Sequence, residues 1–300
     1  MIETRLLRYF LAIAREQSIT RAAESLYVSQ PTLSRQMKEL EDALGVQLFV
    51  RGKRQTLLTE EGVYLRARAQ EMMQIMEKTE ATLKNSGSVI AGDIYVGYGE
   101  TPAVAMLMDV YGEIQREHPD IHLRIYSGNA ESILERMDKG IIDVGLLLGA
   151  PRMEKYDYID LPYADQFGVL MPEDHPLAQK KAVTFDDLKN VPIAIPQQAF
   201  DGQHETLPAV WEKDDLKSVL CTYNLLYNAT FLAEQGTCLV FCLDRLVDLN
   251  GSRHLAFRPM DPPVHVPAVL VTKKYQTFSP AVRLFLERIR RRVGKDVQAS

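Results

Sequence analysis

Residues 18–44 constrain the fold of this chain more than any other segment. They read S-I-T-R-A-A-E-S-L-Y-V-S-Q-P-T-L-S-R-Q-M-K-E-L-E-D-A-L, which predicts two short amphipathic helices joined by a tight turn. In the second helix one stripe is apolar and the opposite face is polar. The stripe consists of Leu33, Met37, Leu40 and Leu44, and the opposite face carries Pro31, Arg35 and Lys38. This pattern is typical of a helix-turn-helix, in which one helix enters a DNA groove.

The flanking residues support the same interpretation. Residues 3–16 predict a preceding helix, and Thr20 is expected to cap the next one through Leu26. Ser29 is a good N-cap for the second helix of the pair, where Pro31 is tolerated in the first turn. Gly45 is expected to end that helix.

A basic hairpin is expected directly after the helices. Residues 46–59 alternate as strands do on both sides of R-G-K-R, so three cations with no anion lie at the predicted tip. Such a wing suits a phosphate backbone or a minor groove, although a solvated turn would also be charged.

The residues that we expect to contact DNA come from these helices and the wing. Arg35 is the first choice for a base edge or a phosphate, and a glutamine can read adenine. The alternative is that the polar residues only solvate an exposed helix. The full set is Thr20, Arg21, Ser29, Gln30, Pro31, Thr32, Ser34, Arg35, Lys38, Arg51, Lys53 and Arg54.

A long helix is predicted from Thr59, with Glu60 and Glu61 favourably placed in its first turn. Its apolar and small residues follow a four-three spacing over about 25 residues, or roughly 38 Å. The stripe is Leu58, Gly62, Leu65, Ala69, Met72, Met76, Thr79 and Leu83. We expect pairing with a second chain, and the alternative is a helix that packs on its own domain.

The charge distribution separates the N-terminal part from the rest. The chain of 300 residues has a net charge of −5, but residues 1–58 carry nine Lys/Arg against six Asp/Glu and the remainder carries 26 against 34. A basic head on an acidic body supports DNA binding by the head. No stretch reaches the roughly 18 apolar residues of a membrane span, and Arg8 and Arg15 interrupt any signal peptide. A cytoplasmic protein is therefore expected.

After the small junction at residues 85–88, strands and helices alternate. Strands are predicted at 93–99, 121–128 and 142–149, with helices near 102–117 and 131–139 between them, so a parallel sheet covered by helices is expected. A second such unit begins near Tyr163, with strands at 166–172, 191–196, 218–223 and 238–241. A strand at 265–272 and a helix at 279–292 follow. Two α/β lobes of this kind form a cleft for a small molecule.

These segments resemble the LysR-type transcriptional regulators. The resemblance rests on L-R-Y-F (7–10), S-I-T-R-A-A-E-S-L (18–26), the run 28–45, L-F-V-R (48–51) and L-T-E-E-G (58–62). Weaker matches lie at 171–178, 186–196 and 279–290, so the resemblance covers nearly the whole chain. One departure is G-T-C-L-V-F-C-L-D (236–244), where the family commonly has a glycine and a proline that are missing here.

The resemblance implies an α+β multidomain fold. A winged helix-turn-helix would span residues 1–58, a linker and dimerisation helix 59–88, and an effector-binding domain similar to periplasmic binding proteins 89–300. Lobe I would comprise about 89–162 and 267–300, and lobe II about 163–266. The resemblance also implies a cytoplasmic homotetramer that bends double-stranded promoter DNA in response to a small-molecule effector. On this resemblance RNA polymerase is a candidate further partner, because such regulators usually activate a target operon.

Ten residues are candidates for contacts with the effector, because ligands of parallel α/β sheets gather at the carboxyl ends of the strands. The candidates are Glu100, Thr101, Pro102, Ser127, Gly128, Asn129, Pro196, Gln197, Gln198 and Asn224. Ordinary helix caps and loop residues are the alternative. The carboxylate of Glu100 opposes an anionic effector unless it points away, so the charge of the ligand stays open.

The sequence disfavours three other classes of function. The sequence contains no nucleophile–base pair, phosphate loop or dinucleotide fingerprint, and its histidines lack metal-ligand spacing, so no enzyme, cofactor or metal is expected. A solute-binding protein with an accessory head is an alternative that the basic wing and the helical stripe disfavour. Cys238 and Cys242 suggest a redox switch, but thiols in so apolar a segment usually behave as core residues.

Overall fold

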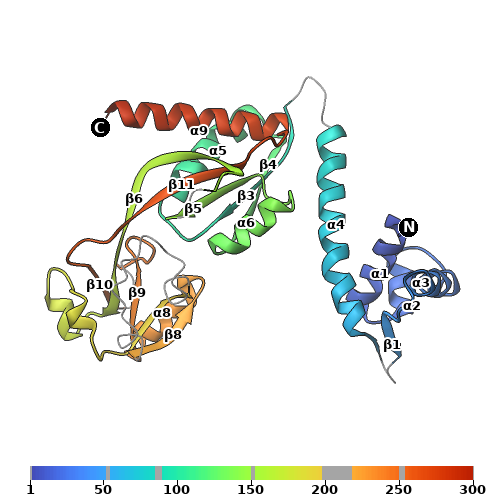
Figure 1. The fold of residues 1–300 in the computed structure, drawn as a ribbon, viewed down its shortest axis with the longest axis horizontal. Coiled ribbons are helices and arrows are strands. Elements are labelled where there is room, and N and C mark those ends of the chain that lie inside the picture. The colour runs from blue at the N-terminus through green and yellow to red at the C-terminus, as the bar shows by residue number, and fades with distance from the viewer. Residues whose placement is uncertain are drawn as a thin grey trace. The chain divides into compact units, whose positions relative to one another are not determined.

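The chain divides into two compact units, which are described separately. The computed structural model describes residues 2–51, 55–84, 90–149, 153–197, 218–249 and 254–299. Met1–Lys84 form the first unit and Asn85–Ser300 the second. Figure 1 labels the helices and strands.

The first unit is built around the predicted helix pair. Its elements are α1 (Thr4–Glu16), α2 (Ile19–Ser25), α3 (Gln30–Leu44), β1 (Phe49–Arg51), β2 (Thr56–Leu58) and α4 (Glu60–Lys84). The expected stripe of α3 is buried, with Leu33 and Leu40 packed against Phe10 of α1. Ser29 accepts a hydrogen bond from the Thr32 amide, which confirms the expected N-cap.

One helix boundary differs from the prediction. Ser18, not Thr20, caps α2, because its hydroxyl accepts a hydrogen bond from the Arg21 amide. Thr20 lies inside the helix with an exposed side chain. Both residues are good N-caps, and the helix begins two residues earlier than a cap at Thr20 requires.

The predicted hairpin is present. β1 and β2 pair in antiparallel fashion, with Arg51 opposite Thr56. Lys53 and Arg54 of its tip lie outside the described residues. Glu41 of α3 connects the hairpin to the helix pair, since its carboxylate accepts hydrogen bonds from the Leu48 amide at 2.7 Å and the Phe49 amide at 3.2 Å.

Helix α4 begins as expected, because the Thr59 hydroxyl accepts a hydrogen bond from the Gly62 amide. The expected pairing of its whole four-three stripe with a second chain is wrong for the first half. Leu65 and Ala69 are buried in the same core as α1. Next to this buried face the helix exposes apolar side chains, and one of them, Met72, belongs to the four-three stripe. This exposed stripe of α4 consists of Tyr64, Met72 and Ile75.

The second unit contains one long mixed sheet. Its strands are β3 (Gly92–Tyr98), β4 (Ile121–Ser127), β5 (Val144–Leu148), β6 (Tyr156–Pro172), β7 (Ile193–Pro196), β8 (Val219–Tyr223), β9 (Leu239–Leu243), β10 (Leu255–Pro259) and β11 (His265–Lys273). The order is β4-β3-β5-β11-β6-β9-β7-β8, with β10 also paired to β6. The helices are α5 (Val104–Glu117), α6 (Ala130–Asp138), α8 (Leu226–Glu234) and α9 (Pro280–Ala299), with short 3-10 turns η1 (Pro176–Gln179) and η2 (Asp186–Leu188).

We call β3, β4, β5, α5, α6 and α9 lobe I, and β7, β8, β9, β10 and α8 lobe II. The parallel pairing of β3 with β4 and β5 confirms the expected β-α-β-α-β order. Strand β6 belongs to both lobes, because its first part pairs with β11 and its end pairs with β9 and β10. The sequence predicted only its last seven residues as strand, and it predicted neither α8 nor β10.

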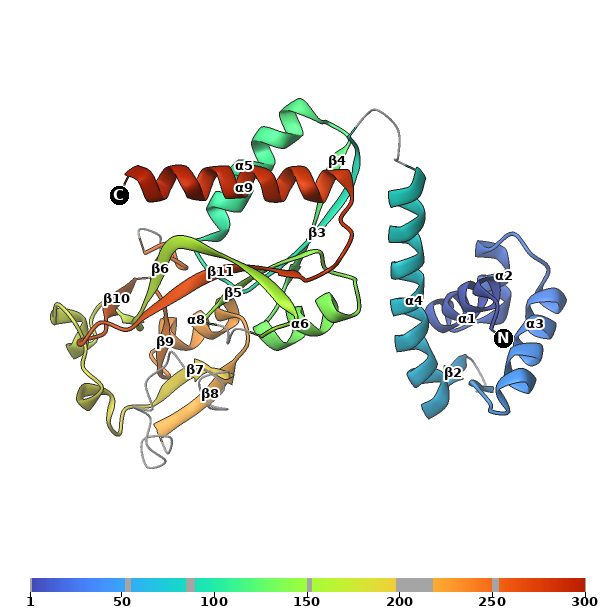
Figure 2. The ribbon, with the colours of Figure 1, turned by 45° about the horizontal axis from the view of Figure 1, so that its top comes forward.

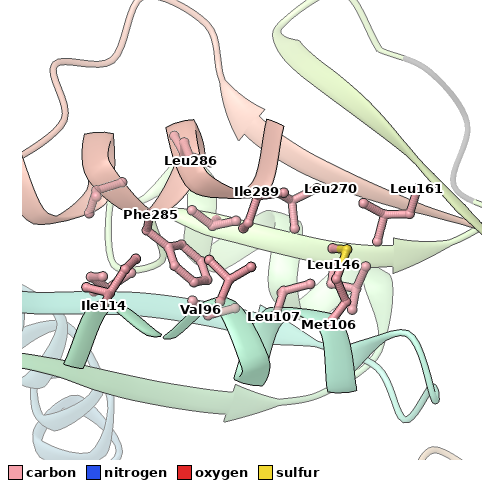
Figure 3. Packing of buried hydrophobic residues seen from close by; sticks show 14 of the residues in the cluster. Val96, Met106, Leu107, Ile114, Leu146, Leu161, Leu270, Phe285, Leu286 and Ile289 are labelled. Carbon is pink, nitrogen blue, oxygen red and sulfur yellow. The ribbon is translucent and has the colours of Figure 1, made fainter. Parts of the chain in front are cut away.

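Helices cover both faces of the sheet in lobe I. Figure 2 shows α5 and α9 side by side over one face and α6 on the other, as the two separate clusters of buried residues require. In Figure 3, Phe285 of α9 points toward side chains of α5 and the sheet, and Leu286 and Ile289 belong to the same buried cluster. No helix among the described residues is both long enough and apolar enough to cross a lipid bilayer.

Candidate DNA-reading face and effector cleft

The exposed side of α3 and the base of the hairpin border one groove. Five of the expected DNA contacts line it, and these are Gln30, Pro31, Ser34, Arg35 and Lys38. Thr56 of β2 and Phe49 of β1 line the groove from the hairpin. The fold therefore places these polar side chains on the side of α3 opposite its buried stripe.

Arg35 is available to a ligand. Its Nε donates to Glu39 Oε1 at 3.1 Å, and 80% of its side chain is exposed. An exposed ion pair of this kind contributes at most about 1 kcal/mol, so DNA can displace Glu39 at little cost. A guanidinium can then form two parallel hydrogen bonds with a guanine edge or with a phosphate.

The remaining candidates for DNA contacts are distributed around this groove. Thr20, Arg21, Ser29 and Thr32 are exposed. The guanidinium of Arg21 also donates to the Glu16 carbonyl oxygen at the end of α1, and the Ser29 hydroxyl contacts Thr32. Arg51 lies in β1. The side chains of Thr20, Arg21, Ser29 and Thr32 are thus not withdrawn into the core of the first unit.

Sequence reasoning missed the role of Glu41. A carboxylate near the C-terminal end of a helix is unfavourable for the helix dipole, which is a signal that this residue has another partner. The structure supplies that partner in the two hairpin amides. Glu41 therefore fixes the wing relative to α3.

The second unit contains a cleft between its two lobes. A cavity of about 90 Å³, partly open to solvent, lies there and is enclosed mainly by apolar side chains. The lining residues are Gly99, Glu100, Gly128, Asn129, Ala130, Leu146, Leu147, Leu148, Phe167, Pro196, Tyr223, Asn224, Leu226, Leu243, Leu246 and Val266.

Five of the ten expected effector residues line this cleft, namely Glu100, Gly128, Asn129, Pro196 and Asn224. Thr101 instead borders a separate hollow next to α8. Pro102, Ser127 and the exposed Gln197 border neither space, and Gln198 lies outside the described residues. The apolar wall was missed, because its residues look like any buried strand in the sequence.

Glu100 reaches across the cleft. It follows β3 of lobe I, and its Oε2 accepts a hydrogen bond from the backbone amide of Leu226, the first residue of α8 in lobe II. The N-terminal end of a helix attracts negative charge. A side chain of one lobe thus occupies the helix end of the other.

A buried carboxyl group lies where β6 passes from one lobe to the other. Asp165 is 1% exposed and accepts a hydrogen bond from the Thr101 hydroxyl. Its second oxygen has no hydrogen-bond donor among the described residues, although Arg245 Nη2 lies 3.6 Å away. Burial raises the pKa of Asp165 above its ordinary value, and the bond from Thr101 opposes this rise.

The stability of the second unit should therefore depend on the protonation of Asp165. A raised pKa in the folded state favours folding below the pKa of the unfolded chain, about 3.9, and this contribution is lost as the pH rises through the folded value. Asp165→Asn should flatten the decline of Tm above pH 4, measured by calorimetry at several pH values. An unchanged slope would show that Asp165 does not titrate in this range.

The buried cysteines are poor candidates for a redox switch. Burial raises the pKa of the Cys242 thiol, and burial together with Cys221 raises the pKa of Cys238. The thiolate is the reactive form, so both thiols should react slowly. Among the described residues, no three His, Cys, Asp or Glu side chains form a group that could hold a metal ion.

We expect a maleimide to modify only Cys221 rapidly in the native protein at neutral pH, because Cys221 is the one of the three cysteines that is partly exposed. All three thiols should react in denaturant. Mass spectrometry of the labelled peptides measures this directly. Rapid labelling of Cys238 or Cys242 in the native protein would contradict the structure and would again support the redox switch as the function.

Together, a helix-turn-helix unit with a wing and a two-lobed α/β unit with a cleft define a ligand-responsive DNA-binding protein as the class. The family model "LysR substrate binding domain" matches residues 88–294, and "Bacterial regulatory helix-turn-helix protein, lysR family" matches residues 4–63. The chain therefore belongs to the LysR family of DNA-binding transcriptional regulators with an effector-binding domain.

Individual relatives agree with this assignment. The chain is 29% identical over 298 residues to the Hca operon transcriptional activator HcaR of Escherichia coli, covering 98% of this chain and 99% of the relative. It is 30% identical over 183 residues to a hydrogen peroxide-inducible genes activator of Pectobacterium carotovorum, covering 61% of this chain and 60% of the relative. Full-length CbnR complexed with its target DNA shares the fold, with a TM-score of 0.73 and 21% identity over 97% of this chain and 99% of that one.

Proposed function

We propose that α3 reads operator DNA in the major groove and that a small molecule in the interlobe cleft modulates this binding. The groove formed by Gln30, Pro31, Ser34, Arg35 and Lys38 is the observation that carries the proposal. The exposed candidates Thr20, Arg21, Ser29 and Thr32, with Arg51, Lys53 and Arg54 of the wing, would hold the phosphate backbone.

Selection of bound duplexes from random DNA by the full-length protein tests the first half of the proposal. A recurrent interrupted palindrome is expected, because two symmetric heads read two half-sites. Recovery of DNA without any shared sequence would contradict sequence-specific reading. Genes beside matching genomic sites would then suggest metabolites to screen as effectors.

The cleft residues Glu100, Gly128, Asn129, Pro196 and Asn224 are proposed as effector contacts. The effector unit would span residues 89–300, following a head at 1–58 and a linker helix at 59–88. A cytoplasmic regulator without enzymatic activity fits these parts, since the relatives with assigned roles are named as regulators. Contact with RNA polymerase would follow if the protein activates transcription.

Self-association is proposed to begin at the exposed stripe of α4. Tyr64, Met72 and Ile75 are 67%, 40% and 39% exposed and project from a side of the helix that the head core leaves uncovered. A second copy of α4 would bury them. The resulting dimers would associate further into the homotetramer that the family resemblance implies.

Ile75→Glu should therefore shift the protein toward smaller species in light scattering coupled to gel filtration. The substitution places a charge in an apolar contact, which is unfavourable unless the charge is paired. Gln70→Glu, on another exposed side of α4, is the matched control and should leave the mass unchanged. Equal masses for Ile75→Glu and the unmodified chain would place the dimer contact elsewhere.

A further inference from the structure

The interlobe cleft combines an apolar wall with negative charge, and its described lining contains no positive charge. Its wall is made by the buried side chains Leu146, Phe167, Leu243 and Val266. Such a surface favours an apolar ligand body, because water leaves both surfaces on binding. The polar contacts of the ligand must therefore come from the few polar groups at the rim.

Glu100 contributes the only ionisable carboxylate to the described lining of the cleft, and none of the described lining residues is Lys, Arg or His. The two rim amides are neutral. Asn129 Oδ1 accepts from the Ser132 amide, and Asn224 Oδ1 accepts from the Leu225 amide, so both oxygens already have local partners. Within the described residues, an anionic ligand would find no counter-charge in the cleft.

The N-termini of two helices, α6 and α8, border the cleft, and each already has a side-chain acceptor, Asn129 at α6 and Glu100 at α8. The amide of Leu226 at the start of α8 donates to Glu100 Oε2. A ligand carboxylate at this helix end would have to displace Glu100 or lie beside a like charge in a site with little water. The carboxylate of Glu100 keeps further lone pairs for a donor, since one amide uses only part of its accepting capacity.

We infer that this cleft selects small apolar molecules that carry an amine and discriminates against carboxylates of the same shape. An ammonium group can form charge-assisted hydrogen bonds with Glu100 while its apolar body covers Phe167 and the neighbouring leucines. This inference rests on the proposed role of the cleft as the effector site and adds the chemical class of the effector.

Calorimetric titration of the full-length protein with matched probes tests the inference. The probes form three sets, and each set has one apolar body, which is phenylethyl, cyclohexylethyl or n-hexyl. Within a set the three probes differ only in the end group, which is an amine, an alcohol or a carboxylate. We expect the amine to bind about tenfold or more tightly than the carboxylate in the sets that fit. Glu100→Gln, which can still accept the Leu226 amide, should reduce this ratio to near unity. Glu131→Gln, which removes the charge of an exposed carboxylate of α6, should preserve it.

Three results would overturn the inference. These are a carboxylate that binds the unmodified protein as tightly as its amine, an amine preference that survives Glu100→Gln, and no binding of any amine up to millimolar concentration. A gel shift of the unmodified protein on its selected operator separates this failure from that of the proposed function. If the protein binds its operator specifically but shows no preference for amines, the inferred chemical class of the effector is wrong and the proposed DNA-binding function stands.

Discussion

Arg35→Ala is expected to weaken operator binding by about 100-fold or more while the oligomer stays intact. One bidentate contact to a base edge contributes about 1–3 kcal/mol, and a symmetric dimer loses it at both half-sites. The structure gives Arg35 no core role, because its side chain is 80% exposed and pairs with the exposed Glu39. Binding to an operator selected from random DNA, measured by gel shift at fixed salt, gives the affinity.

Arg291→Ala is the matched control. Arg291 also pairs with a glutamate four residues away, Glu287, and is similarly exposed at 67%, but it lies on α9 of the second unit. Its loss removes the same charge and a comparable ion pair, so operator affinity should hardly change. Normal operator binding by Arg35→Ala, or an equal loss with Arg291→Ala, would refute the assignment of Arg35 as a DNA contact.

Gly62→Ala is expected to destabilise the first unit by about 1–3 kcal/mol or more, because the added methyl group overpacks a rigid site. A Cβ atom at Gly62 would lie 2.2 Å from the backbone oxygen of Leu48. That oxygen accepts a hydrogen bond from the Thr59 amide and cannot move independently of the hairpin. Hydrogen exchange of amides in the first unit, followed in increasing urea, measures the loss.

Gly112→Ala provides the comparison for this change. A Cβ atom at Gly112 in α5 meets nothing within 4 Å, so the same substitution should stabilise the second unit by up to about 1 kcal/mol through helix propensity. The two substitutions should therefore change stability in opposite directions, with a loss at Gly62 and a gain at Gly112. A Gly62→Ala protein with unchanged exchange would mean that the contact between the hairpin and α4 is looser than the structure indicates.

Local signals predicted the head because its elements depend on neighbouring residues. The spacing of Leu33, Met37 and Leu40 defines the buried side of α3. As expected, the helix begins after Ser29 and ends at Gly45. The error at Thr20 has the same origin, since Ser18 offers an equivalent cap two residues earlier. Local chemistry identifies helix ends only to within such alternatives.

Long-range pairing explains what the sequence could not reveal in the second unit. The first part of β6 carries Asp157, Asp160 and Asp165, so it lacks the apolar run of a buried strand, and its pairing with β11 joins segments about 100 residues apart. Strand ends correctly suggested Glu100 and Asn224 near the cleft. The hydrogen bond from Leu226 to Glu100 depends on how the lobes close, which no local pattern encodes.

The four-three stripe of α4 shows a third limit of prediction from the sequence. Four-three spacing identifies an apolar face, but it does not say whether the face packs within one chain or between two. Leu65 and Ala69 pack within the chain, and Tyr64 and Ile75 stay exposed. Both faces follow helical periodicity, so only the packing of α1 distinguishes them.

The burial of Leu65 and Ala69 against α1 makes α4 and the reading head a single rigid piece. In a dimer joined through the exposed stripe of α4, this rigid piece would fix the distance between the two α3 helices. One extra base pair between operator half-sites rotates one of them by about 35°, since a turn holds 10–10.5 base pairs. The rigid piece could not absorb that rotation, so the DNA itself would have to twist or bend.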